Sequence, residues 1–180
     1  GNIGSPPFDH LEEITEESYL VIEMSAHQLS MIRNSPHIAV MLNLFSEHLD
    51  HFKSAEAYFT AKTKITRYQQ EDDVLIYNSE DALLRNYLKP YLKKRRICTF
   101  SLKESFAPGL HVKDEKVFYN SCQSEEQIFD STKAFKLVGR HNISNILAAS
   151  CAAISIGLPA ERIQGAVESF SGLEHRLEFV

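Results

Sequence analysis

Several features that would define a class of protein are missing from this chain of 180 residues. It has no run of about 18 apolar residues, so no membrane-spanning helix is predicted. Its net charge of -5 gives no reason to expect nucleic acid as the main partner. No glycine is followed by lysine, so the chain contains no phosphate-binding loop ending in Gly-Lys.

Cysteine is scarce, with only Cys98, Cys122 and Cys151 and no CxxC pair. Three widely spaced cysteines predict neither a disulfide framework nor a zinc site. We expect buried or free thiols in a protein from a reducing compartment.

The length predicts one domain of ordinary size that can bury a hydrophobic core. The chain begins directly with the stretch Gly1-Asn2-Ile3-Gly4, without an initiating methionine or a signal peptide. That opening is typical of the inside of a protein, so we expect a fragment of a longer chain.

The order of apolar and polar residues predicts alternating strands and helices. Strands are expected at 19–24, 37–43, 73–77 and 96–100, a hairpin at 110–112 and 116–119 followed by 127–129, and helices at 54–68, 81–89, 141–156 and 160–170. The prediction is therefore a three-layer α/β fold, in which helices flank a mainly parallel sheet with a small antiparallel hairpin flap. Residues 103–133 carry no motif to which we assign a function.

A cluster of acidic residues and histidines follows the predicted strand 37–43. Glu47, His48, Asp50 and His51 all lie within eight residues of Asn43. Sheets of this kind bind ligands at the carboxyl ends of their strands. The chemistry of the protein is therefore predicted to lie at this edge.

Five blocks of sequence, taken in order, resemble the Mur ligase family. The blocks are Glu23–Gln28, Asn43–Asp50, Tyr58–Lys62, the G-R-H-N-x-x-N motif from Gly139 to Asn145, and Gly172–Glu178. The resemblance covers essentially the whole chain. The G-N-I-G stretch at the start of the chain and the block Glu23–Gln28 favour one member of this family. That member adds D-glutamate to UDP-N-acetylmuramoyl-L-alanine in peptidoglycan synthesis.

The resemblance implies an ATP-dependent ligase that needs Mg²⁺. The family transfers the γ-phosphate of ATP to a carboxylate, and an amine then attacks the acyl phosphate. Glu23, His48 and Lys62 match its catalytic and metal-binding residues, with Lys62 matching a lysine that CO₂ converts to a carbamate. A carbamate would supply an anionic oxygen ligand.

The remaining site residues are also implied by the resemblance. Asn142, Asn145 and Arg176 match residues that contact the nucleotide. Asn2 and Ser25, together with His48, match residues that face the muramoyl substrate.

The resemblance further implies a partial central ATP-binding domain. The UDP-binding N-terminal domain, the phosphate-binding loop and the C-terminal domain would lie outside residues 1–180. We expect the chain alone to be inactive, because phosphoryl transfer would lack its main positioning device. We also expect either self-association through an exposed sheet edge or marginal stability. We expect the parent to be a cytoplasmic bacterial enzyme without membrane or nucleic-acid partners.

Each assignment has a plainer alternative. Glu23 can be a solvated acid, His48 a packed loop histidine, and Lys62 a lysine that extends to solvent. Asn142 can simply cap a helix. For the whole chain, the alternatives are another Mur ligase, a folylpolyglutamate synthase-type ligase, or a binding module without catalysis.

Overall fold

A computed structural model gives the fold and describes residues 6–45, 52–133 and 139–172. The strands are β1 (Ile38–Met41), β2 (Val74–Asn78), β3 (Arg96–Ser101), β4 (Gly109–Lys113), β5 (Lys116–Asn120) and β6 (Glu125–Asp130). The α-helices are α1 (Ala26–Met31), α2 (Ala55–Arg67), α3 (Ala82–Leu88), α4 (Arg140–Ser155) and α5 (Ala160–Ser169), and 3₁₀ helices span Pro7–Glu13, Lys89–Lys94 and Ser131–Lys133. None of the described helices is both long and apolar enough to cross a membrane.

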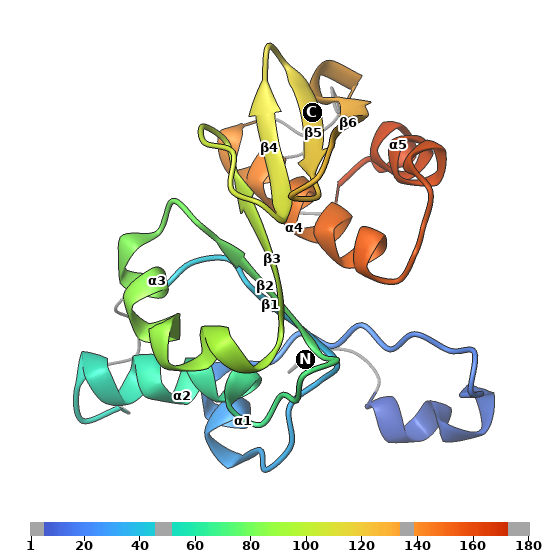
Figure 1. The fold of residues 1–180 in the computed structure, drawn as a ribbon. Helices are drawn as coiled ribbons and strands as arrows, with labels where there is room; N and C mark the ends of the chain where they lie inside the picture. The colour runs from blue at the N-terminus through green and yellow to red at the C-terminus, as the bar shows by residue number, and fades with distance from the viewer. Residues whose placement is uncertain (1–5, 46–51, 134–138, 173–180) are drawn as a thin grey trace.

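The six strands form one sheet in the order of the sequence, from β1 to β6. β1, β2, β3 and β4 are parallel to one another, whereas β5 is antiparallel to both β4 and β6. Helices cover both faces of the sheet, as Figure 1 shows. The predicted fold class, a mainly parallel sheet between helices with an antiparallel flap, is confirmed.

The interior strand β2 explains the two helical layers. Its apolar residues are all buried, with Leu75 and Ile76 at 0% exposure. Leu75 packs among the side chains of α1, α2 and α3, whereas Ile76 packs with α4 on the opposite face. A strand that is apolar on both faces can be buried only between two layers.

The hairpin of β4 and β5 has the turn that the sequence predicts. Asp114 and Glu115 connect the strands with φ values of 50° and 61°. Two consecutive residues with positive φ are typical of a tight hairpin turn whose twist matches that of its strands. Lys113 pairs with Lys116 next to this turn, and Val112 pairs with Val117 one position further from it.

The strand predicted at 19–24 is wrong. Residues 14–25 form neither helix nor strand, and in Figure 1 this blue stretch is drawn as a plain tube without an arrow or a coil. Val21 is 98% exposed and Tyr19 is 70% exposed. An apolar run becomes a strand only when a neighbouring strand satisfies its backbone groups, and among the described residues β1 pairs with β2 alone.

A buried arginine fixes the end of α2 to the start of β3. Arg95 is 9% exposed, and its guanidinium donates to the Thr66 carbonyl and, over 2.5 Å, to the Thr66 hydroxyl. The Tyr91 ring lies 5.7 Å from the guanidinium carbon. A cation at the C-terminus of a helix stabilises its unpaired carbonyls. This contact therefore holds the helix that carries Lys62.

Gly109 allows β4 to approach β3, and its replacement by alanine tests that contact. A Cβ at Gly109 would lie 2.8 Å from the carbonyl oxygen of Phe106 and closer still to that of Thr99. We expect Gly109→Ala to lower the free energy of unfolding by about 1–3 kcal/mol, the usual cost of overpacking, in a urea titration.

Gly165→Ala in α5 is the matched control, because a Cβ added to Gly165 would have no other atom within 4 Å among the described residues. Alanine favours helix over glycine by up to about 1 kcal/mol, so this variant should be as stable as the parent or more so. Equal stability of Gly109→Ala and the parent would contradict the close-approach argument.

Candidate functional site

The carboxyl ends of β1, β2 and β3 meet at one edge, where polar side chains are bonded to each other. The Asn78 amide at the end of β2 donates to the Asn43 side chain at 3.2 Å. Asp81 accepts from the backbone N–H groups of Leu44 and Leu84, each at 2.9 Å. One carboxylate therefore caps α3 and also holds the chain that leaves β1.

A second acid fixes the chain that leaves β3. Glu80 accepts from the Ser101 hydroxyl at 3.0 Å and from the backbone N–H of Leu102. The Lys103 ammonium lies 3.9 Å from its other oxygen. Glu80 and Asp81 are thus positioning residues that the sequence analysis did not single out. An acid directly before a helix was the available signal for Asp81.

Lys62 lies on α2, which begins beside this edge. Ser54 caps the helix by accepting from the Ala57 N–H at 3.1 Å. The Lys62 ammonium lies 5.0 Å from the centre of the Tyr58 ring, a cation–π contact. Within the described part of the chain, no carboxylate forms an ion pair with Lys62.

The start of α1 is brought next to the same aromatic side chains. The Phe52 ring lies 5.1 Å from the His27 ring and 5.3 Å from the Tyr58 ring, centre to centre. Tyr58 is 2% exposed, so it packs between the layers. His27 in the first turn of α1 therefore contacts Phe52, whereas Lys62 on α2 contacts Tyr58, the other member of this aromatic pair.

Two of the predicted site residues lie at the start of α1. Ser25 forms a capping box: its hydroxyl accepts from the Gln28 N–H at 3.3 Å, and the Gln28 side chain accepts from the Ser25 N–H at 2.9 Å. Glu23 lies two residues earlier and is exposed. The plainer interpretation of Glu23 as a solvated acid agrees with this exposure, which also leaves its carboxylate open to a cation.

Asn142 and Asn145 lie in the first two turns of α4, on the other face of the sheet. The N–H of Asn142 donates to the Gly139 carbonyl at 3.0 Å, and the helix begins without a side-chain cap. The last residues of α4 lie beside the first residues of β2 and β3, so α4 runs against the strands. Its N-terminus therefore points toward the carboxyl edge, where its dipole favours an anion.

Asn2, His48 and Arg176 fall outside the described residues, as do Glu47, Asp50 and His51. Among the described residues, no three His, Cys, Asp or Glu side chains are grouped closely enough to hold a metal ion. Of the three predicted metal ligands, Glu23 and Lys62 lie among the described residues and His48 does not.

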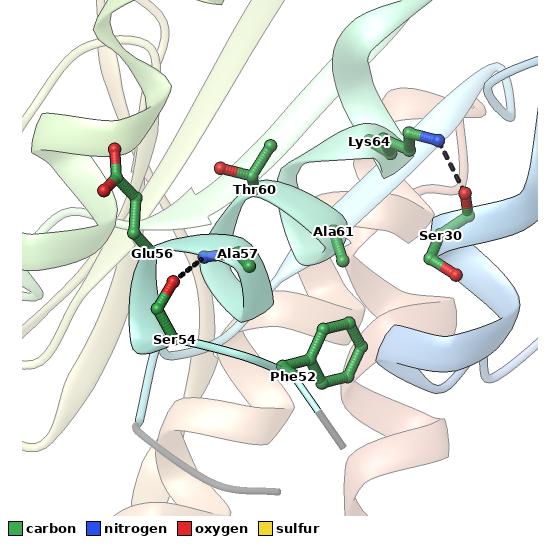
Figure 2. A pocket seen from close by; sticks show the side chains of 8 residues that line it. All are labelled: Ser30, Phe52, Ser54, Glu56, Ala57, Thr60, Ala61 and Lys64. Carbon is green, nitrogen blue, oxygen red and sulfur yellow. Dashed lines mark hydrogen bonds between the residues drawn. The ribbon is translucent and has the colours of Figure 1, made fainter. Parts of the chain in front are cut away.

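An open groove of about 500 Å³ lies between α1 and α2. Figure 2 shows its lining, with the Lys64 ammonium donating to the Ser30 carbonyl at 2.5 Å and the Phe52 ring between the two helices. Lys62 is not part of this lining. The groove is therefore lined by the face of α2 that lies beside the face carrying Lys62.

Burial affects the ionisation of one side chain at the sheet edge. Desolvation raises the pKa of Tyr77 near the end of β2, while Arg85 acts in the opposite direction. The phenol is therefore neutral at physiological pH and contributes no negative charge to the edge.

Comparison with known proteins identifies the family. The model of the Mur ligase middle domain matches residues 5–153. The UDP-N-acetylmuramoylalanine–D-glutamate ligases of Clostridium kluyveri and of Clostridium botulinum strain Loch Maree are 37% and 38% identical to this chain over 180 residues. Each match covers 100% of this chain and 38% of the relative, so the chain spans less than two fifths of the length of these relatives.

The fold is shared with a solved structure of MurF from Acinetobacter baumannii. That comparison gives a TM-score of 0.63 at 21% identity, and it covers 86% of this chain and 33% of MurF. The family match and the whole-chain identity agree with this fold, and the chain therefore belongs to the Mur ligase family.

Proposed function

We propose that the protein containing this chain is an ATP-dependent ligase that joins D-glutamate to UDP-N-acetylmuramoyl-L-alanine. One observation carries the proposal: relatives named for this reaction match the chain from end to end at 37% and 38% identity. The reaction activates a carboxylate by phosphoryl transfer from ATP, and the amine of D-glutamate then displaces phosphate. It would take place in the cytoplasm during synthesis of peptidoglycan precursors.

The first turns of α4 are the proposed nucleotide contacts. The side-chain amides of Asn142 and Asn145 can both donate and accept hydrogen bonds, as recognition of a base or ribose requires. The N-terminus of α4 adds a favourable field for phosphate. Arg176, whose guanidinium can bond two phosphate oxygens at once, would complete this side of the site.

Glu23, His48 and Lys62 are the proposed metal-binding residues. Bound Mg²⁺ would neutralise the charge that gathers on the phosphoryl and carboxylate oxygens. The exposed carboxylate of Glu23 is a hard oxygen ligand that suits Mg²⁺. Lys62 would fit as an oxygen ligand after carboxylation by CO₂, and among the described residues no carboxylate forms an ion pair with its ammonium.

Ser25, together with Asn2 and His48, is proposed to contact the muramoyl substrate. The capping box uses one lone pair of the Ser25 hydroxyl as an acceptor. Its O–H group and its second lone pair can serve a ligand. The box also fixes the Ser25 backbone, so the hydroxyl is held at a defined position at the start of α1.

In this proposal, residues 1–180 form part of the central domain, and segments outside them bind UDP, the ATP phosphates and the amino acid. The chain alone should then be inactive. The exposed side chains at 19–22 and the outer edge of β1 support self-association of the isolated chain.

The proposed reaction is tested by phosphate release from the complete protein. With ATP, Mg²⁺ and UDP-N-acetylmuramoyl-L-alanine, we expect release that requires D-glutamate within a panel of amino acids and dipeptides. Release with a different amino acid would overturn the proposed acceptor and keep the ligase mechanism. If no acceptor gives phosphate release, the alternative of a binding module without catalysis would be favoured.

The proposed role of Lys62 is tested by substitution in the same assay. Lys62→Ala and Lys62→Arg should each lower kcat by about 100-fold or more, because neither side chain can become an anionic oxygen ligand. Lys89→Ala is the control, since Lys89 is an exposed lysine that donates to Asn86 at 3.2 Å. Full activity of Lys62→Ala, with unchanged circular dichroism, would contradict the assignment.

A further inference from the structure

Two buried cysteines meet where β3 packs on α4. Cys98 is 5% exposed and Cys151 is 0% exposed. Along β3, Ile97 faces the layer of α1, α2 and α3, whereas Cys98 faces α4. Both thiols therefore lie in the same core, on two elements that pack directly against each other.

The position of the Cys151 thiol brings it to the Cys98 side chain. Its sulfur lies 3.5 Å from the carbonyl oxygen of Thr99, the residue next to Cys98. The Cys98 side chain is also its hydrogen-bonding neighbour. Burial, reinforced by this neighbour, raises the pKa of the Cys151 thiol. Cys151 is therefore protonated in the reduced protein, and its sulfur is held next to β3 at the position of Cys98.

A cavity of about 260 Å³ leads to this pair from the amino ends of β2 and β3. Cys98 forms part of its wall, together with Arg96, Tyr119 and Ser155. Because a water molecule occupies about 30 Å³ in the liquid, the cavity has room for a peroxide or a small disulfide. It lies at the edge of the sheet opposite Asn43 and Asn78, away from the proposed ligase site.

We propose that Cys98 and Cys151 are a redox modification site, at which hydrogen peroxide or a low-molecular-weight disulfide closes a reversible bond between β3 and α4. With peroxide, the Cys98 sulfur attacks one oxygen, the O–O bond breaks, and a sulfenic acid and water form. The Cys151 thiol then attacks that sulfur and releases a second water. Two thiols are oxidised by two electrons, and one peroxide is reduced to two waters.

A low-molecular-weight disulfide gives the same product by two exchange steps. Cys98 attacks the reagent, one reagent thiol leaves, and a mixed disulfide forms. Cys151 then displaces the second reagent thiol. In a reducing compartment such a bond is transient, as redox-sensing disulfides are. It would tie the helix that carries Asn142 and Asn145 covalently to the sheet.

The test uses the complete protein and requires no ligase activity. The reduced protein is treated while folded with hydrogen peroxide or with cystamine, a small disulfide, and is then alkylated and digested without reductant. We expect a cross-linked peptide pair containing Cys98 and Cys151, two hydrogens lighter than the separate peptides and cleaved by dithiothreitol. The oxidised protein should also melt at a higher temperature, because the link restricts the unfolded chain.

Two variants provide the controls. Cys122→Ser removes the exposed cysteine and should leave the cross-link and the rise in Tm unchanged. Cys151→Ser should stop the reaction at a Cys98 sulfenic acid or mixed disulfide and abolish the rise in Tm. In the unaltered protein, retention of both buried thiols under conditions that oxidise Cys122 would overturn the proposal, as would a link from Cys98 to any other cysteine.

Discussion

Burial of β2 on both faces is the constraint from which the rest of the fold follows. Its run of four apolar residues requires a helical layer on each side and a neighbouring strand on each edge. With both faces covered, the carboxyl edge of the parallel strands is the place where polar side chains can reach a ligand. Asn78, at the end of this same strand, accordingly begins the polar network that joins the ends of β1 and β3.

The sequence predicts those parts of the fold whose signals are local. Asp81 at a helix start, Ser54 before α2 and the Asp114-Glu115 turn each have a short-range reason for their structure. The strand predicted at 19–24 has the right apolar pattern, but a strand also depends on a partner that can be far away in the chain. That requirement is not local, and the structure provides no neighbouring strand among its described residues.

The candidate site was predictable in its residue types and not in its contacts. Resemblance to the Mur ligases points to Lys62 and Ser25, but not to the aromatic pair that brings α1 and α2 together. The bond from Asp81 to the Leu44 N–H joins residues 37 positions apart. Such a contact depends on the register of β1 against β2, which the apolar pattern alone does not specify.

The contact between Lys62 and Tyr58 has a consequence for how this helix responds to a change of charge. The face of an aromatic ring is negative, so it attracts an ammonium and repels a carboxylate. Tyr58 is buried in the core. Any reaction that makes the end of the Lys62 side chain anionic must therefore also drive it off the ring. The buried tyrosine would then convert a chemical change at one nitrogen into a displacement of the Lys62 side chain away from the ring.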